Sequence, residues 1–271
     1  MAFHSPQHIA QLVVEAGVKK AIMPVRNTLL LGFLGGAFIS LGFLLNIRVI
    51  ANLPEAWGSF SSFLGGAVFP VGLMLITIAG GELLTGNMLA LPMAILAKRA
   101  TVGQLLKNWL LIVVSNFVGA IFVAYFFGHI VGLTETGPFL EKTIAIAQAK
   151  ISDTFIQALV SAIGCNWLVC LAIWMAFGAE DIGGKILAIW FPIMAFVVMG
   201  FQHVVANMFV IPAAIFAGHF GWADYFFNFA PVFIGNAIGG GVFVGFMYWM
   251  VYKGAIENKA SAPNKKLKKA V

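Results

Sequence analysis

Charged side chains are scarce in this sequence of 271 residues, since only 10% are Asp, Glu, Lys or Arg while 61% are hydrophobic. The mean hydropathy is correspondingly high, at +0.96. Because soluble domains contain about 25% charged residues, this composition excludes an ordinary soluble domain and indicates an integral membrane protein. The first 26 residues contain several charged side chains before any long apolar run, so we expect no cleavable signal peptide.

Cysteine is also nearly absent, and the two that are present, Cys165 and Cys170, lie in one apolar segment. Five positions apart on a helix, their side chains diverge, so we interpret them as packing residues and not as a disulfide. No pair of His or acidic residues has metal-ligand spacing, which argues against a metal site and against a membrane-embedded enzyme. The net charge of +6 comes from lysines at the flanks of apolar segments and in the tail, so we expect no nucleic-acid partner.

Four apolar segments have the length of ordinary membrane-spanning helices, about 20 residues or slightly more: 28–47, 108–130, 154–178 and 225–251. Two longer tracts, 56–97 and 186–223, each fit either one broken span plus a loop or a tight hairpin of two spans. With six spans, 13 of the 16 Lys and Arg residues fall on the side of both termini. The positive-inside rule therefore favours six spans, in a multi-pass protein of the cell membrane with both termini in the cytoplasm.

A polar interruption of an apolar tract occurs twice in the sequence. The segments "GGELLTGNMLALPMAIL" (80–96) and "GFQHVVANMFVIPAAIF" (200–216) are identical at six of 17 positions when aligned at an offset of 120. The third and sixth spans echo each other at the same offset through Asn116 and Asn236. In a six-span topology the two copies run antiparallel. This predicts an all-α membrane protein of two inverted three-helix repeats, about 27–132 and 150–252, with broken second and fifth helices and a site where the breaks meet. Residues 1–26 and 253–271 would flank this channel domain as a cytoplasmic interfacial helix and a basic cytoplasmic tail.

The breaks need a purpose, because irregular backbone at membrane depth survives only where protein or a water-filled cavity satisfies its polar groups. We expect Gly80, Gly81 and Gly86 to supply unusual dihedral angles, and Asn87 and Asn207 to open the second half-helices by capping free N–H groups. Half-helix N-termini attract small anions. No Lys or Arg lies in the span interiors, so the sequence favours fast passage of an anion over tight binding.

The second break departs from the first most notably at one position, because His203 stands where the first copy has Leu83. An ionisable residue near the middle of the membrane is usually functional, and His203 can donate a hydrogen bond to an anion or, when protonated, offset its charge or give it a proton. A packed, hydrogen-bonded histidine is the alternative. Thr85 is expected to face the same point as a hydroxyl donor, unless it bonds back to its own helix. Glu82, matched by Gln202, is interpreted as a structural acceptor for backbone N–H groups.

The segments "GGELLTGNM", "GCNWLVCLAIWMAF" and "GFQHVVANMFVIP" closely resemble the formate/nitrite transporter family, and the resemblance runs over nearly the whole chain. It implies an aquaporin-like six-span fold, a homopentamer in which every protomer has its own pore, and no cofactor. It also implies transport of small monovalent anions such as formate, nitrite and hydrosulfide. We expect formate first, nitrite second and hydrosulfide third.

The resemblance also implies roles for single residues. His203 matches the central pore histidine, Thr85 the threonine opposite it, and Lys150 a vestibule lysine that draws anions toward the outer mouth. Asn166 and Asn207 match asparagines that hydrogen-bond around that histidine. The apolar residues of two constrictions correspond to Phe69, Leu73, Leu83, Leu84 and Phe196. Such rings favour a neutral weak acid, because a charge pays a large desolvation cost there; simple core packing is the alternative.

Three departures from the family's pattern lie beside the expected selectivity residues. Gln202 stands where an acidic residue commonly precedes the histidine, Leu84 replaces an aromatic residue, and Gly86–Asn87 replace a hydroxyl-bearing pair. These departures bear on the identity of the anion more than on the fold. Leu84 in particular predicts an inner constriction wide enough for acetate or lactate.

The ends of the chain predict further elements. Ser5–Pro6 are typical of a helix start, and an apolar stripe before Lys19–Lys20 fits an interfacial helix at the cytoplasmic mouth, which in the family is a candidate gate. The tail "PNKKLKKAV" is expected to be disordered and to contact anionic lipid of the bilayer. The remaining competitor is an aquaporin-type channel for neutral solutes, but neither break has an Asn-Pro-Ala triplet and a central His203 is superfluous to it.

Overall fold

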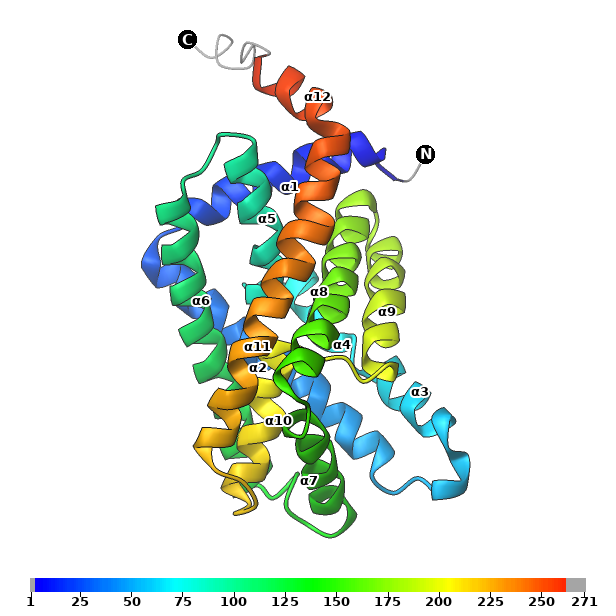
Figure 1. The fold of residues 1–271 in the computed structure, drawn as a ribbon. Helices are drawn as coiled ribbons and strands as arrows, with labels where there is room; N and C mark the ends of the chain where they lie inside the picture. Colours follow the sequence, from blue (N-terminus) through cyan, green and yellow to red (C-terminus); the bar gives the residue numbers. More distant parts are fainter. Residues whose placement is uncertain (1–2, 262–271) are drawn as a thin grey trace.

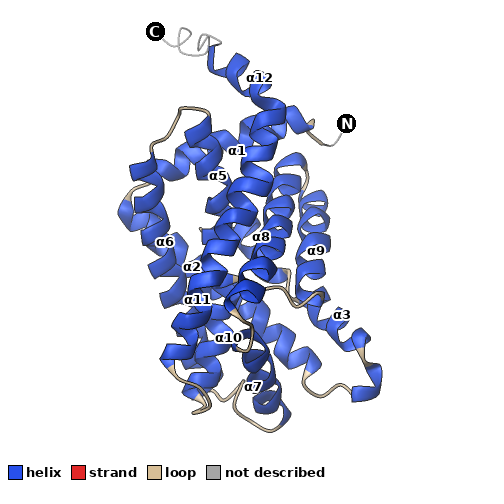
Figure 2. Ribbon diagram, in the orientation of Figure 1, coloured by secondary structure: helices blue, strands red, loops and turns tan. Residues whose placement is uncertain are grey.

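The computed structural model describes residues 3–261, with side chains described up to residue 257. Figure 2 shows helices joined by loops throughout this part of the chain and no strand; one isolated antiparallel bridge joins Phe3 to Ala179. Five of the helices are long and apolar enough to cross a membrane. The prediction of an all-α membrane fold is confirmed. The segment "PNKKLKKAV" lies outside the described residues.

The first half of the chain follows the predicted order of elements. α1 lies across one end of the bundle, α2 crosses it, the next tract crosses back through a break, and α6 returns (Figure 1). The bounds are α1 (Pro6–Ala21), α2 (Val25–Ile50), a 3-10 turn (Glu55–Trp57), α3 (Ser59–Val68), α4 (Val71–Met74), a π-helical turn (Leu75–Gly80), α5 (Leu84–Leu96) and α6 (Val102–Phe122), which continues as a π-helix (Val123–Ile130).

The second half repeats this path in the opposite direction, and α12 ends at the same end of the bundle as α1 (Figure 1). The bounds are α7 (Pro138–Ile151), α8 (Phe155–Gly178), α9 (Ile182–Val198), α10 (Val204–Phe216), α11 (Trp222–Ile238), a π-helical stretch (Gly239–Phe246) and α12 (Met247–Ser261). The backbone of Tyr252, with φ −107° and ψ 15°, kinks α12 at the predicted junction between the last span and the tail.

Each long apolar tract proves to be one broken span and not a hairpin of two. α10 has 13 residues, fewer than the about 20 that a span needs, and it continues the crossing that α9 begins (Figure 1). The first broken span runs toward the end that carries α1, and the second runs away from it. The predicted six crossings with two antiparallel broken helices are therefore confirmed.

The repeat extends further than the predicted limits, because its offset changes along the chain. Asn116 and Asn236, 120 positions apart, donate to the carbonyls of Gly32 and Ala162, which are 130 positions apart. α2 thus corresponds to α8 at the larger offset. α1 corresponds to α7 in the same way, because Asn108 and Asn228 donate to the carbonyls of Lys20 and Lys150. The first copy is longer mainly in the connection 51–58, where the second has only 179–181.

Small residues bring the helices of each copy close together. A Cβ on Gly119 of α6 would collide with a carbonyl of α2, and one on Gly239 would collide with a carbonyl of α8. In the same way Gly17 of α1 lies against the carbonyl of Ala90 in α5. Close backbone contact of this kind is typical of helices that pack inside a membrane.

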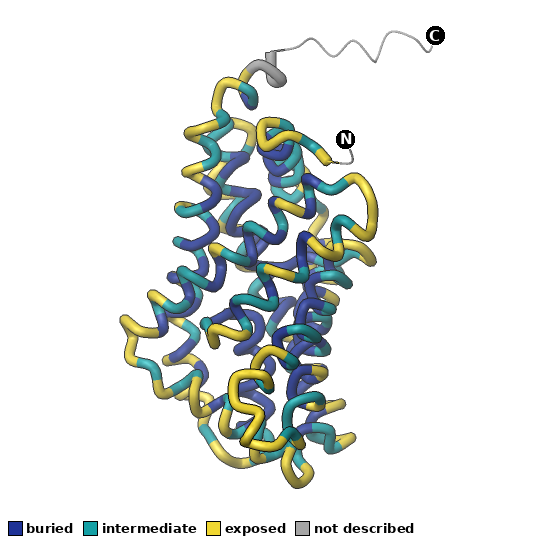
Figure 3. The backbone as a smooth tube through the Cα atoms, turned by 90° about the vertical axis from the view of Figure 1, so that its right-hand side faces the viewer, coloured by how far each residue is buried: buried dark blue, intermediate teal, exposed yellow. Residues whose placement is uncertain are grey.

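The outer surface of the bundle is apolar. One stripe on α6 repeats every fourth residue and is at least 50% exposed: Leu106, Leu110, Val114 and Val118. Figure 3 shows that buried residues run through the interior of the bundle while exposed ones mark its loops and outer faces. An apolar surface of this extent is typical of contact with lipid or neighbouring subunits.

Candidate functional site

Both breaks begin with a glycine in the left-handed region. The φ angles of Gly80 and Gly200 are 106° and 73°, so a side chain at either position would strain the backbone. The expectation of unusual dihedral angles is confirmed for Gly80 but wrong for its neighbours. Gly81 is extended, with φ −170°, and Gly86 is an ordinary residue of α5.

The second half-helices are capped by asparagines from other spans. The Oδ1 atom of Asn116 accepts from the N–H of Leu84 at 3.0 Å, and that of Asn236 accepts from the N–H of Val204 at 2.9 Å. Each Nδ2 also donates to the carbonyl of the residue two positions earlier, Glu82 or Gln202. The predicted capping by Asn87 and Asn207 is therefore wrong, because both lie one turn inside their helices.

Asn87 belongs to a polar cluster that ties α1 to the first break. The Lys20 ammonium donates to both carboxylate oxygens of Glu82 at 2.7 Å. The Asn87 amide donates to Glu82 at 3.0 Å and to Oδ1 of Asn108 at 2.8 Å, and Asn108 donates to the carbonyl of Lys20. The role of Glu82 as an acceptor is as predicted, but its recorded partners are side chains and not loose backbone N–H groups.

A matching cluster ties α7 to the second break. The Asn207 amide donates to Oε1 of Gln202 at 2.7 Å and to Oδ1 of Asn228 at 2.9 Å. Gln202 donates to the carboxylate of Asp153 and, like Asn228, to the carbonyl of Lys150. Asn108 and Asn228 lie 120 positions apart, so the offset of the repeat already pointed to this pair, which the sequence interpretation missed.

His203 and Thr85 meet where the two breaks face each other. The Nε2 atom of His203 lies 3.0 Å from Oγ1 of Thr85, and both side chains are buried. The other ring nitrogen, Nδ1, accepts from the N–H of Ala206 at 3.0 Å. A nitrogen that accepts holds no proton, so the neutral ring bears its proton on Nε2 and donates it to Thr85. The Thr85 hydroxyl hydrogen then stays available for another acceptor.

Asn166 hydrogen-bonds to the backbone of Thr85 and not to the histidine ring. Its amide donates to the carbonyl of Thr85 at 3.3 Å and to that of Asn236 at 2.6 Å. The Cys170 thiol also donates to the carbonyl of Thr85. Asn166 and Asn207 thus hydrogen-bond beside His203, to the backbone of Thr85 and to Gln202, and neither makes a recorded hydrogen bond to the ring itself. Their role around the histidine stays a prediction.

Apolar side chains close the space around His203. Phe69 packs edge-on against Phe196 with ring centroids 5.7 Å apart, and the His203 ring stacks on Phe196 at the same distance. The cavity left between these rings is about 10 Å³, which is at most the space of one water molecule. It is lined by Ile39, Phe69, Leu73, Leu83, Val169, Ile193, Phe196 and His203. Leu84 does not line it and is fully buried as the first residue of α5.

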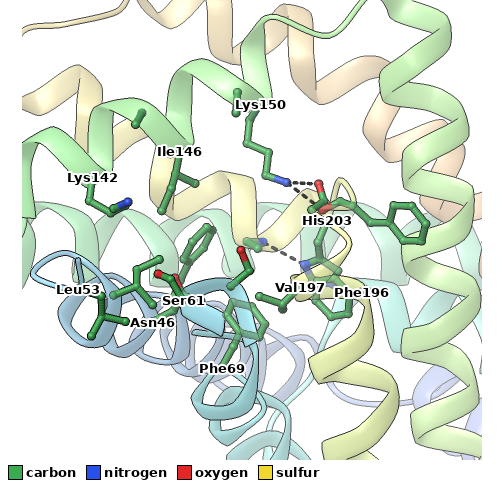
Figure 4. A pocket seen from close by; sticks show the side chains of 18 of the residues that line it. Asn46, Leu53, Ser61, Phe69, Lys142, Ile146, Lys150, Phe196, Val197 and His203 are labelled. Atoms are coloured by element: carbon green, nitrogen blue, oxygen red, sulfur yellow. Dashed lines mark hydrogen bonds between the residues drawn. The ribbon is translucent and has the colours of Figure 1, made fainter. Parts of the chain in front are cut away.

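A wider cavity lies on each side of this apolar layer. The α7-side vestibule, of about 510 Å³, reaches from Lys142 and Lys150 to Phe69, Phe196 and His203. In Figure 4 the Lys150 side chain points toward the break, where its ammonium donates to the carbonyls of Gly200 and Phe201 at 2.7 and 2.9 Å.

The α1-side vestibule, of about 220 Å³, is lined by Lys20, Lys185, Leu73, Leu83 and Asn87 among others. The sequence interpretation singled out neither of these lysines as a site residue. That they line one cavity was not apparent from the sequence, because they lie on α1 and α9, far apart in the chain. Among the described residues, no group of three or more His, Cys, Asp or Glu gathers to bind a metal.

Known proteins are similar to this chain in sequence and in fold. The model of a family described as formate/nitrite transporter matches residues 7–250. The chain is 64% identical over 253 residues to the formate channel BtFdhC of Bacillus thuringiensis, covering 93% of this chain and 97% of that one. It is 62% identical over 252 residues to the uncharacterized transporter YrhG of Bacillus subtilis, covering 93% and 95%.

Two solved structures are similar in fold. One, an FNT family ion channel, has a TM-score of 0.84 at 29% identity, covering 90% of this chain and 98% of that one. The other, a pentameric formate channel with formate bound, has a TM-score of 0.74 at 31% identity, covering 87% and 99%. Sequence, fold and the paired breaks agree, and the chain belongs to the formate/nitrite transporter family.

Proposed function

We propose that this protein is a channel through which small monovalent anions, above all formate, cross the cell membrane without being chemically changed. A relative at 64% identity is named a formate channel, and a similar structure is named as pentameric with formate bound. By the same comparison this chain would form a homopentamer with one pore per protomer, its α1 and α12 at the cytoplasmic end. Nitrite is the second candidate and hydrosulfide the third.

The observation that supports this function best is the placement of the His203–Thr85 pair. His203 lines the apolar layer, which leaves about 10 Å³ between two cavities that each contain lysines, and Thr85 lies behind His203 at 3.0 Å. Lysines concentrate anions in the vestibules, and the helix N-termini of α5 and α10 begin at the breaks and favour negative charge. At the apolar layer, His203 and the Thr85 hydroxyl beside it are the polar groups available to replace water as hydrogen-bond donors. A channel for neutral solutes has no use for these charges.

Coupling to protons is a separate part of the proposal. Protonation of His203 at Nδ1 would place that N–H against the N–H of Ala206, which now donates to it at 3.0 Å. A charged ring would therefore have to leave its position as the cap of α10. In its present position the ring acts as a neutral donor, and an anion that takes up a proton pays a smaller desolvation cost at the apolar layer.

Reconstituted protein tests this function directly. Proteoliposomes should take up labelled formate in a saturable manner, nitrite should compete, and empty liposomes should not take up formate at this rate. If transport is coupled to protons, a pH gradient with the acidic side outside should accelerate the uptake of formate into the same vesicles. Permeation of glycerol without any anion would instead assign the protein to the neutral-solute class.

Lys150 is expected to make anion capture depend on pH. Its ammonium is partly buried beside the second break, and this burial lowers the pKa of Lys150 to about 8 although Asp153 acts in the opposite direction. The charge is therefore present below pH 8 and lost above it, whereas formate stays ionised throughout. At low ionic strength we expect formate capture from the α7 side to fall by about three- to ten-fold between pH 7 and pH 9.

The matched variant is Lys150→Arg, because a guanidinium stays charged over this range. Formate capture by this variant should not change with pH, and capture by Lys150→Ala should be low at both pH 7 and pH 9. High salt should reduce the differences in formate capture between the wild type and these two variants, because salt screens the charge. An arginine variant that follows the wild-type curve would show that another group titrates.

A further inference from the structure

The two lysines nearest the breaks are not equivalent in charge. Lys20 is held by both oxygens of Glu82 at 2.7 Å, and the side chains are only 21% and 8% exposed. At the counterpart position of Glu82 stands the neutral Gln202, and the Lys150 ammonium binds only backbone carbonyls in the recorded contacts. The charge of Lys20 is thus cancelled within its own cluster by a direct ion pair. In the described part of the chain Lys150 makes no recorded ion pair, and the nearby Asp153 binds the amide of Gln202 instead.

Another cation lines the α1-side vestibule. Lys185 lies in the first turn of α9, is partly buried, and lines the same cavity as Lys20. That cavity has no acidic residue in its lining. Within residues 3–261 no ion pair of Lys185 is recorded. The two acids that precede it point elsewhere and do not line the cavity, since Asp181 caps α9 through the N–H of Gly184 and Glu180 contacts His4.

We propose that Lys185 is the anion-capture residue of the α1-side vestibule, and that Lys20 is a structural residue that joins α1 to the first break. This assignment rests on the proposed anion transport. A close ion pair presents a dipole to the cavity, and its potential falls off faster with distance than that of a single charge. An anion that enters from the α1 side therefore meets Lys185 as the main uncompensated charge of the lining. On the α7 side, Lys150 is the lysine that lies beside the break.

Side-specific kinetics test the assignment. Vesicles sorted by orientation through a C-terminal tag present either end of the channel to labelled formate. At low ionic strength, Lys185→Ala should raise KM about three- to five-fold for formate supplied at the α1 side. Entry from the α7 side should keep its KM. Lys185→Arg should behave as the wild type, because the charge is what matters.

Lys107→Ala is the matched control. Lys107 lies in α6 at the same end of the bundle, is exposed and lines neither vestibule, so its removal changes the net charge equally. Its KM should stay near the wild-type value on both sides. An equal rise in KM for this control would overturn the assignment, because it would show a general surface effect.

A second variant tests the role of Glu82 as the neutralising partner. Glu82→Gln copies the side chain that already stands at Gln202, and it frees the charge of Lys20. Added to Lys185→Ala, it should return KM at the α1 side to within about two-fold of the wild type.

An unchanged α1-side KM in Lys185→Ala would overturn the proposal for Lys185. A wild-type protein that carries no formate from either side would instead refute the proposed function.

Discussion

Replacing His203 by asparagine is expected to lower formate flux by about 10- to 100-fold and to remove the pH dependence that the imidazole contributes. Asparagine is shorter, so its oxygen can still accept from the N–H of Ala206, but its amide no longer reaches Thr85. A hydrogen bond to a charged group is worth about 1.5–3 kcal/mol, which corresponds to this range of rates. Uptake of labelled formate at several pH values measures both effects.

Two further variants separate the pore from the rest of the protein. Thr85→Val keeps the shape of the side chain and removes its hydroxyl, so it should reproduce most of the loss of flux. His219→Asn removes a histidine that is exposed in the loop after α10, and it should leave flux and pH profile intact. If His203→Asn transports formate with an unchanged pH profile, the protonation role of this residue is wrong.

Sulfate is expected not to pass the channel at a measurable rate, whereas formate and nitrite should pass. This second large effect depends on the charge of the anion. The Born cost of entering an apolar region grows with the square of the charge, so a divalent anion pays roughly four times the cost of a monovalent one. The layer of Phe69, Leu73, Leu83 and Phe196 leaves only about 10 Å³ and contains no charged side chain. Competition by unlabelled anions against labelled formate measures the difference.

A widened channel distinguishes charge from size. Leu83→Ala enlarges the layer, so acetate and lactate should begin to pass, but sulfate should still be excluded because the surroundings stay apolar. Passage of sulfate through this variant would show that width alone excluded it. Leu84→Ala is the matched control, since Leu84 is equally buried but does not line the cavity. The earlier expectation that Leu84 itself admits larger acids is therefore not supported by its position.

Much of this architecture was predictable because membranes impose simple rules on sequence. Long apolar segments, the distribution of lysines and the repeated break predicted six crossings in two antiparallel copies. They also predicted that Thr85 and His203 face one point, which their 3.0 Å contact confirms. These features depend on local composition and on one offset, and both are visible in the chain.

The polar contacts behind the breaks were not predictable in the same way. An asparagine at a helix start normally suggests a cap, but Asn116 and Asn236 reach the half-helix ends from other spans and leave Asn87 and Asn207 free for the clusters beside α1 and α7. The change of offset from 120 to 130 hid the correspondence of α1 with α7. Lys185 was overlooked because only the folded chain brings α9 to the same cavity as α1.

The separation between the residues that fix the breaks and those that form the barrier has an evolutionary consequence. Asn116, Asn236 and the two amide clusters hold the backbone from behind, whereas Phe69, Leu73, Leu83 and Phe196 make no recorded side-chain hydrogen bond. A mutation in the barrier can therefore alter what passes without dismantling the scaffold. Substrate range becomes a property that natural selection, or a directed library of a few positions, can retune step by step while every intermediate still folds.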